Sequence, residues 1–190
     1  AATKAIRENL IQALKNNNSS LYKEFLNDKH KSELESNYFR HSEKYIFGNA
    51  GDINVYALFT EVYFNLIKQN GRSGFIVPPG IATDDTYKSF IKHLIGEKIL
   101  VSFYNFTNRG YLFREVESTM AFALYVFEKN NTNSKISVAA KLWQVEHLQL
   151  PGRVYNLDAI DIKTLNPNTE NLPIFENSID AKLVIRIYEG

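Results

Sequence analysis

The sequence predicts an α/β fold in which helices flank a sheet and the last strands pair antiparallel. In some segments apolar residues recur at spacings of three and four, whereas other segments are short continuous apolar runs. These are the patterns of amphipathic helices and of buried strands. Along the chain they alternate as helix, strand, helix, strand, loop and strand, which is typical of α/β proteins. The last runs are close enough in sequence to pair antiparallel.

The composition indicates a globular chain with a sizeable core. It has 190 residues, 44% of them hydrophobic, and a formal net charge of +1, so no overall basic field points to nucleic acid. The absence of cysteine excludes disulfides and thiolate zinc sites. No apolar run is long enough to span a membrane, and the first residues lack a signal-peptide core. We therefore expect a soluble, cytoplasmic protein.

The first fifty residues predict helices and no strand. Residues 3–15 carry apolar side chains at helical spacing, and "NNNSS" ends that helix. Residues 20–35 predict a second, strongly charged helix, and residues 36–51 look irregular and aromatic. A third helix is expected over 53–69, with Asp52 as its cap.

A buried strand is predicted over residues 73–78, "SGFIVP", because its apolar run does not alternate with polar residues. Pro78 and Pro79 end it, since proline has no N–H to donate to a sheet. In open α/β sheets, ligands bind beyond the carboxyl ends of strands. The loop "PPGIATDD" is therefore expected to face a ligand cleft.

The later elements follow the same apolar patterns, which become weaker toward the end of the chain. They comprise a helix over 85–96 capped by Thr83 or Asp84, strands over 99–106, 120–127 and 136–143, and two short helices after residue 150. Residues 128–135, "EKNNTNSK", predict a polar, hairpin-like turn.

Hydrolytic and metal chemistry find no support in the residue pattern. The four histidines are scattered without metal-ligand spacing, so no metal site is expected. There is no phosphate loop, nucleophile elbow or Ser-His-Asp pattern. Asp84 and Asp85 could form an acid pair, but we expect them to complement the N-terminus of a helix.

Most of the many aromatic residues are expected in the core, but Tyr111 and Phe113 differ. They lie in a polar loop and are flanked by Arg109 and Arg114. An aromatic side chain in a basic loop can stack on a nucleobase while arginines hold its phosphate. These residues are therefore candidates for contacting a nucleic acid.

Taken together, the order of motifs resembles adenine-specific (N-6) DNA methylases of restriction–modification and phage-defence systems, the class with an Asn-Pro-Pro-Tyr/Trp signature. The stretch "GDINVYALFTEVYFNLIKQNGRSGFIVPPGIATDDTYKSFIKHL" looks like the second half of their catalytic domain, and "ILVSFYNFTNRGYLFREVESTMAFALYVF" continues it. The resemblance implies part of a class I, Rossmann-like, S-adenosylmethionine-dependent methyltransferase sheet. It further implies a helical insertion over 1–50, catalytic-domain residues over 51–145 and a linker toward target recognition over 146–190.

The chain also departs from the family pattern. The glycine motif that binds the cofactor and the Asn-Pro-Pro-Tyr/Trp signature are absent, and the only Asn-Pro is "NPN" at 166–168. Both motifs are expected upstream of residue 1, so the catalytic residues are expected there too. The chain is thus interpreted as a fragment that binds S-adenosylmethionine poorly and is inactive alone.

The resemblance assigns roles to two phenylalanines. Phe59 matches a family phenylalanine that packs on the adenine ring of the cofactor, although a core role is equally compatible with the sequence. Phe113, in "GYLFREV", matches one that stacks on the adenine flipped out of double-stranded DNA. Unstacking a base costs a few kcal/mol, and an aromatic face returns about 1–3 kcal/mol.

The remaining expected substrate contacts surround the same cleft. Pro78, Pro79 and Gly80 are expected to shape the strand end, and Arg109 and Arg114 to contact phosphates. The implied reaction is direct methyl transfer from the sulfonium to the exocyclic amine of adenine, driven by positioning.

Two other interpretations stay open at this point. The chain could be a DNA-binding or assembly module on a degenerate methylase scaffold, or a stable piece without an independent role. A sheet without its first strands would expose an edge, so we expect either self-association through that edge or its covering by the helices of residues 1–35.

Overall fold

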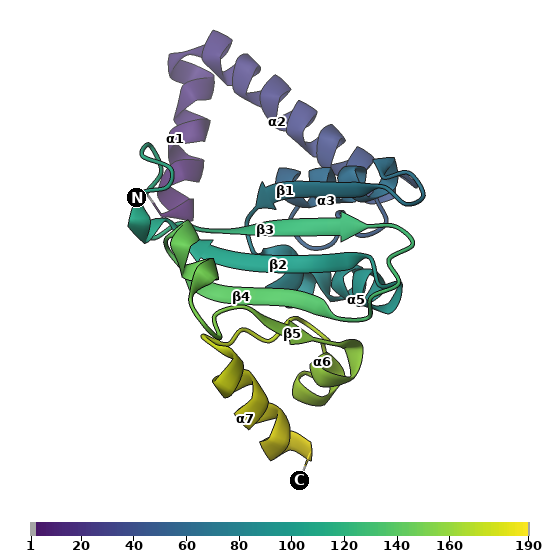
Figure 1. The fold of residues 1–190 in the computed structure, drawn as a ribbon. Helices are drawn as coiled ribbons and strands as arrows, with labels where there is room; N and C mark the ends of the chain where they lie inside the picture. Colours follow the sequence, from purple (N-terminus) through teal and green to yellow (C-terminus); the bar gives the residue numbers. More distant parts are fainter. Residues whose placement is uncertain (1–2, 190) are drawn as a thin grey trace. The chain divides into compact units, whose positions relative to one another are not determined.

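The structure, a computed structural model, describes residues 3–189 and contains two compact units, residues 1–46 and 47–190. The first unit holds only helices, and the second holds the whole sheet (Figure 1). The predicted α/β class is confirmed.

The first unit is a pair of consecutive helices, α1 (Lys4–Asn17) and α2 (Ser19–His41). Asn18 separates them, because its N–H bonds the carbonyl of Leu14 at 2.8 Å while its side chain accepts from the N–H of Leu21 at 3.1 Å. One residue thus ends α1 and caps α2. Helix α2 is longer than predicted, since Ser and Asn inside a helix cost only a few tenths of a kcal/mol each.

Five strands form one sheet in the order β1-β3-β2-β4-β5, and only β2 and β4 pair in parallel. Their bounds are β1 (Arg72–Val77), β2 (Leu100–Thr107), β3 (Ala121–Glu128), β4 (Ile136–Leu142) and β5 (Tyr155–Leu157). The expected antiparallel pairing of the last strands is confirmed for β2 with β3, and β5 was not predicted because it is only three residues long.

The hairpin-like turn predicted over 128–135 is wrong. Strands β3 and β4 lie on opposite sides of β2, so the connection between them passes the end of β2 (Figure 1). The residues of the turn cannot show where β4 lies, because the position of β4 depends on its pairing with β2. In that connection Asn130 has a left-handed backbone (φ 64°), and its side chain donates to Asn70 Oδ1 at 3.1 Å.

Helices α3 (Val55–Leu66) and α5 (Lys88–Gly96) cover one face of the sheet (Figure 1). The short helix α4 (Gly80–Thr83) and the 3₁₀ turn η1 (Asp85–Tyr87) lead into α5. The main core lies between helices and strands, and its largest fully buried side chains include Phe90, Ile91, Leu94, Phe103, Tyr125 and Phe127. Neighbouring strand residues point to opposite faces, which leaves Tyr104, Phe106, Phe122 and Leu124 for a second, smaller cluster on the other face.

Helix α3 begins later and ends earlier than predicted. The N-cap position is held by Asn54 rather than Asp52; its side chain makes no capping bond, and its carbonyl accepts from the N–H groups of Ala57 and Leu58 at 3.0 and 3.2 Å. Inside the helix the buried carboxylate of Glu61 accepts from the N–H of Gly48 at 2.8 Å. That contact secures the chain that leads into α3.

The end of the chain packs onto the sheet through β5, α6 (Ala159–Leu165) and α7 (Ser178–Glu189). A capping box between Asp158 and Asp161 starts α6. The hydroxyl of Tyr155 accepts from the N–H of Phe175 at 2.9 Å and donates to its carbonyl at 3.3 Å. Burial raises the pKa of Tyr155 to about 12, so the hydroxyl keeps its proton for that bond.

Among the described strands, β1 pairs only with β3, so its other edge has no strand beside it. Ile76 of β1 is 52% exposed. We propose that the chain self-associates through this edge, and expect Ile76→Lys to weaken that association at least about tenfold, because a charged lysine opposes edge pairing. Sedimentation velocity over a range of protein concentrations measures this.

The matched control is Ile160→Lys, which changes an exposed isoleucine on α6. An equal effect of both substitutions would reject the β1 edge as the contact. A wild-type chain that stays monomeric would contradict self-association and favour covering of the edge by residues 1–35.

Candidate functional site at the carboxyl edge of the sheet

The carboxyl ends of three strands meet at one edge of the sheet. Strand β3 is antiparallel to both β1 and β2, so these two run in the same direction, and β4 is parallel to β2. The pairing of Val77 with Ala123 and of Thr107 with Ala121 places the ends of β1 and β2 on either side of the start of β3. The segments 78–80, 108–120 and 143–154 therefore all leave the sheet at this edge.

Strand β1 ends at Val77, as the two prolines predict, and Pro79 starts the short helix α4. The carbonyl of Pro79 accepts a hydrogen bond of 2.8 Å from the hydroxyl of Tyr125. Burial raises the pKa of Tyr125 well above its ordinary value, so this hydroxyl remains a donor. The turn after β1 is thus anchored to β3 beneath it, while Pro78 is exposed.

Gly80 is buried and faces the protein interior. A Cβ atom at this position would lie 2.5 Å from the carboxylate Oδ2 of Asp84 and 2.9 Å from the hydroxyl of Tyr56. Burial, a hydrogen bond to Tyr87 and the nearby charges of Tyr87 and Asp84 raise the pKa of Tyr56. A larger residue here would require the side chains of Asp84 and Tyr56 to move, so glycine allows both groups to lie close to the backbone.

Asp84 occupies the N-cap position before η1, which the sequence predicted for Thr83 or Asp84, and Asp85 lies in the first turn, as expected for a residue that complements a helix N-terminus. Asp84 precedes η1 without a capping bond from its side chain, and it instead accepts from the hydroxyl of Thr83 at 3.2 Å. Asp85 lies in the first turn of η1, where it pairs with Lys88 at 3.2 Å.

The loop over 108–120 is held by a fully buried amide, that of Asn108. Its Nδ2 donates to the carbonyls of Phe113 and Val116 at 2.8 and 2.7 Å, and its Oδ1 accepts from the N–H of Phe113 at 3.0 Å. Sequence reasoning missed this residue, because an asparagine after a strand has the same sequence signature as an exposed turn residue.

Phe113 projects from this loop onto an aromatic stack on the sheet. Its ring meets that of Phe122 edge to face at 5.0 Å, and Phe122 stacks on Phe106 at 5.3 Å with the rings nearly parallel. Phe106 is 2% exposed whereas Phe113 is 41% exposed. The ring of Phe113 is therefore supported from the core side and open on the other.

The two arginines of the loop are exposed, and no salt bridge engages either within residues 3–189. Arg109 belongs to the 3₁₀ turn η2 (Asn108–Gly110), and Arg114 directly follows Phe113. Tyr111 has a left-handed backbone (φ 52°) and is 62% exposed. The loop thus carries exposed aromatic rings and two exposed arginines at this edge of the sheet.

The loop rests against the end of β4. A Cβ atom on Gly110 would lie 1.9 Å from the carbonyl oxygen of Trp143, so the two backbones are in direct contact. Trp143 is itself half-exposed, and its ring meets that of His147 at 4.8 Å.

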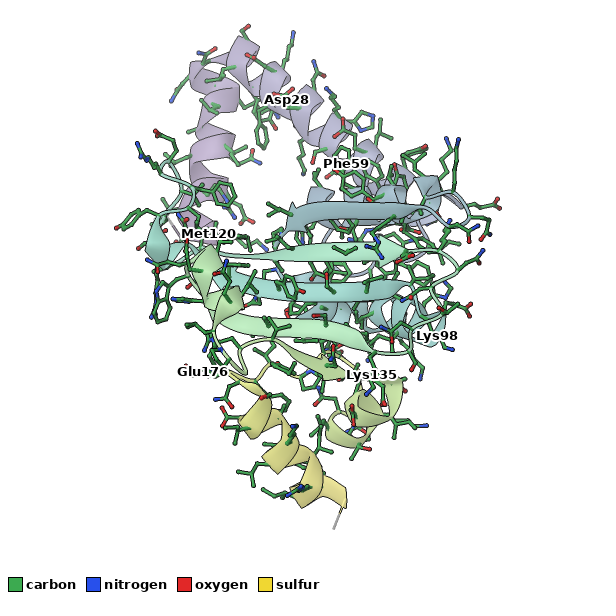
Figure 2. The ribbon with its side chains drawn as sticks, in the orientation of Figure 1. Asp28, Phe59, Lys98, Met120, Lys135 and Glu176 are labelled. Atoms are coloured by element: carbon green, nitrogen blue, oxygen red, sulfur yellow. The ribbon has the colours of Figure 1, made fainter. Side chains whose placement is uncertain are left out.

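Large exposed apolar side chains are frequent in these two segments. They are Tyr111, Leu112, Phe113, Val116 and Met120 in one, and Trp143, Val145 and Leu150 in the other. Figure 2 shows Met120 at the end of the sheet where β3 begins. Exposed apolar groups that gather in this way are typical of binding surfaces.

Phe59 lies on α3 rather than in the loops of this edge (Figure 2). Its ring is 6.2 Å from that of Tyr63, which in turn is 5.0 Å from Phe75 of β1. Phe59 is 52% exposed, so it is not part of the core. No ring contact joins it to Phe113 among the described residues.

Between residues 3 and 189, no three side chains of the metal-binding kinds come together. In the same range, no helix has the length and apolar character needed to cross a bilayer.

Comparison with known proteins connects this geometry with a family. Residues 22–113, just under half of the chain, match the family model of the Eco57I restriction-modification methylases. The resemblance to restriction–modification methylases is thereby confirmed. The matched range contains Phe59, the turn after β1 and Arg109, and it ends at Phe113. A search of curated proteins finds no match.

Several solved structures from such systems are similar to the chain. The type IIG restriction endonuclease BpuSI is 22% identical over 54% of this chain and 12% of its own, with a TM-score of 0.42. A chain from a type I restriction–modification complex is 15% identical over 70% of this chain and 36% of its own, with a TM-score of 0.49. The type I methyltransferase subunit from Streptococcus thermophilus is 14% identical over 82% of this chain and 28% of its own, with a TM-score of 0.42. The present chain thus spans about an eighth to a third of the length of these proteins.

The contact between Gly110 and Trp143 can be tested because Trp143 is the only tryptophan of the chain. Gly110→Ala places a methyl group against the carbonyl oxygen of Trp143, which as backbone cannot easily move. We expect a red shift of the tryptophan emission and stronger quenching by iodide. Gly96→Ala is the control, because nothing lies within 4 Å of a Cβ at Gly96. An unchanged spectrum in Gly110→Ala would contradict the contact.

Proposed function

We propose that the chain is part of a DNA adenine methyltransferase of restriction–modification or phage defence. The whole enzyme would transfer a methyl group from S-adenosylmethionine to the exocyclic amine of an adenine flipped out of double-stranded DNA, in the cytoplasm. The match of residues 22–113 to restriction-modification methylases supports the methyltransferase class. The observation that carries the adenine-stacking role is the half-exposed ring of Phe113 on its aromatic support.

The physical argument for a base at Phe113 compares the stacking free energy that a flipped base loses with the free energy that it gains on an aromatic ring. A base outside the duplex loses stacking worth a few kcal/mol, and an aromatic platform returns about 1–3 kcal/mol per base. Phe113 offers such a platform because Phe122 and Phe106 hold it from below. Arg109 and Arg114 are exposed and form no salt bridge within the described residues, so they can contact the phosphates that flank the base.

The other assigned residues have supporting roles in this proposal. Pro78, Pro79 and Gly80 build the turn beside the loop, with Gly80 contributing through packing rather than by contacting the base. Phe59, half-exposed on α3, would face the adenine ring of the cofactor. The glycine motif, and the residue that polarises the amine, would come from elsewhere in the polypeptide, as the resemblance stated in the sequence analysis implies. Catalysis would then rest on positioning.

Base stacking is testable on the chain itself. The probe is a DNA duplex with 2-aminopurine opposite an abasic site, whose fluorescence falls when the base stacks on a ring. We expect Phe113→Ala to raise the Kd by about 5- to 150-fold, which corresponds to the loss of 1–3 kcal/mol of stacking. Phe113→Trp should preserve the quenching.

The control for that experiment is Tyr188→Ala, which removes an exposed ring on α7. Equal losses in both variants would assign the effect to general adhesion. Wild-type protein that leaves the fluorescence unchanged would reject base stacking by this chain.

Cofactor binding separates the fragment interpretation from a self-sufficient enzyme. The sequence lacks the glycine motif, so we expect calorimetry to show S-adenosylmethionine binding weaker than about 1 mM, which is less than about 4 kcal/mol of affinity. Micromolar binding would contradict this expectation. The alternative of a non-catalytic DNA-binding or assembly module predicts that methylation stays absent even when the natural upstream sequence is restored.

A further inference from the structure

The side chain of Asn108 uses both its amide nitrogen and its amide oxygen for hydrogen bonds within one loop. Besides the three bonds of its amide to Phe113 and Val116, its backbone N–H donates to the carbonyl of Met120 at 2.9 Å, and its carbonyl accepts from the N–H of Tyr111 at 2.8 Å. These contacts reach from the first residues of the loop to its last. The amide is completely buried, so water cannot replace a lost partner.

Few other bonds order this loop. Inside it the backbone contributes turns from Val116 to Phe113 and from Met120 to Glu117, at 3.1 Å each. Seven consecutive residues from Tyr111 to Glu117 are exposed. A surface loop of this length, with only the short 3₁₀ turn η2 at its start, is normally mobile. Asn108 is therefore the main contact that closes it.

The amide of Asn108 binds both backbone groups of a single residue, Phe113. The N–H and the carbonyl of Phe113 are held from one side, and its ring is held by Phe122 from another. These two constraints together define where the ring points. A ring held in this way does not have to be ordered when a ligand arrives, which improves binding.

We propose that Asn108 is a positioning residue that presents the ring of Phe113 to the flipped base; this rests on the function proposed above. Asn108 itself does not touch the base, because it is buried under the loop. Its contribution is to keep the ring in the stacking orientation before DNA binds. Loss of the amide would leave Phe113 in the chain but without a defined orientation.

The order of the loop can be measured by trypsin cleavage, since trypsin cleaves after Arg109 and Arg114, which both lie in the loop. We expect Asn108→Ala to raise the rate of cleavage at these two bonds at least tenfold under native conditions. Asn108→Asp keeps the acceptor for the N–H of Phe113 but loses both donors, and we expect a similar rise. The matched control is Asn166→Ala, which removes an amide that donates to the carbonyl of Asn171 at 2.7 Å in another loop.

Unchanged cleavage in both Asn108 variants would overturn the proposal, and so would an equal rise in Asn166→Ala. If Asn108→Ala fails to fold, judged by its circular dichroism melting curve, Asn108→Asp decides. The trypsin measurement needs no DNA, so it tests the ordering of the loop even if the function proposed above is wrong.

The link to Phe113 is tested with the 2-aminopurine duplex and a double-mutant cycle. We expect Asn108→Ala to raise the Kd at least fivefold, and the double variant with Phe113→Ala to bind no more weakly than Phe113→Ala alone, because Asn108 acts through that ring. Additive losses would show a role independent of Phe113 and overturn the proposal. Absence of quenching with wild-type protein would instead reject base stacking, the function proposed above.

Discussion

The antiparallel insertion of β3 between β1 and β2 is the constraint on which the candidate site depends. It lets β1 and β2 run in the same direction without being neighbours, so the turn after β1 and the long loop after β2 leave the sheet at one edge. The hydroxyl of Tyr125 on β3 then anchors the carbonyl of Pro79, and Phe122 on the same strand carries the ring of Phe113. One strand thus supports both segments from below.

The two faces of the sheet differ in what packs on them. The face under α3 and α5 holds the large core that stabilises the second unit, whereas the other face carries a short aromatic stack that ends at the surface. Alternation along β2 and β3 separates the two, because Phe103 and Tyr125 point into the core while Phe106 and Phe122 point away from it. A stack that begins in a buried ring and ends in a half-exposed one can hold its last ring rigid, which a lone surface aromatic cannot.

Much of the fold could be predicted, because continuous apolar runs and helical spacings are strong local signals. The end of β1 at the prolines, the strands over 99–106 and 120–127, and the antiparallel pairing between them were all visible in the sequence. The predictions failed where the deciding partner was distant. The connection after β3 was interpreted as a hairpin because its composition suits one, but β4 pairs with β2 instead.

The sequence by itself determined the class of fold, the resemblance to restriction–modification methylases and the choice of Phe113 as an exposed aromatic in a basic loop. Each of these depends on residue types and their order along the chain. Only the tertiary structure decided that Gly80 lies close to the side chains of Asp84 and Tyr56, and that Asn108 closes the loop around Phe113. A buried glycine and a buried amide derive their roles from atoms contributed by other segments, and the order of residues alone does not show which segments meet.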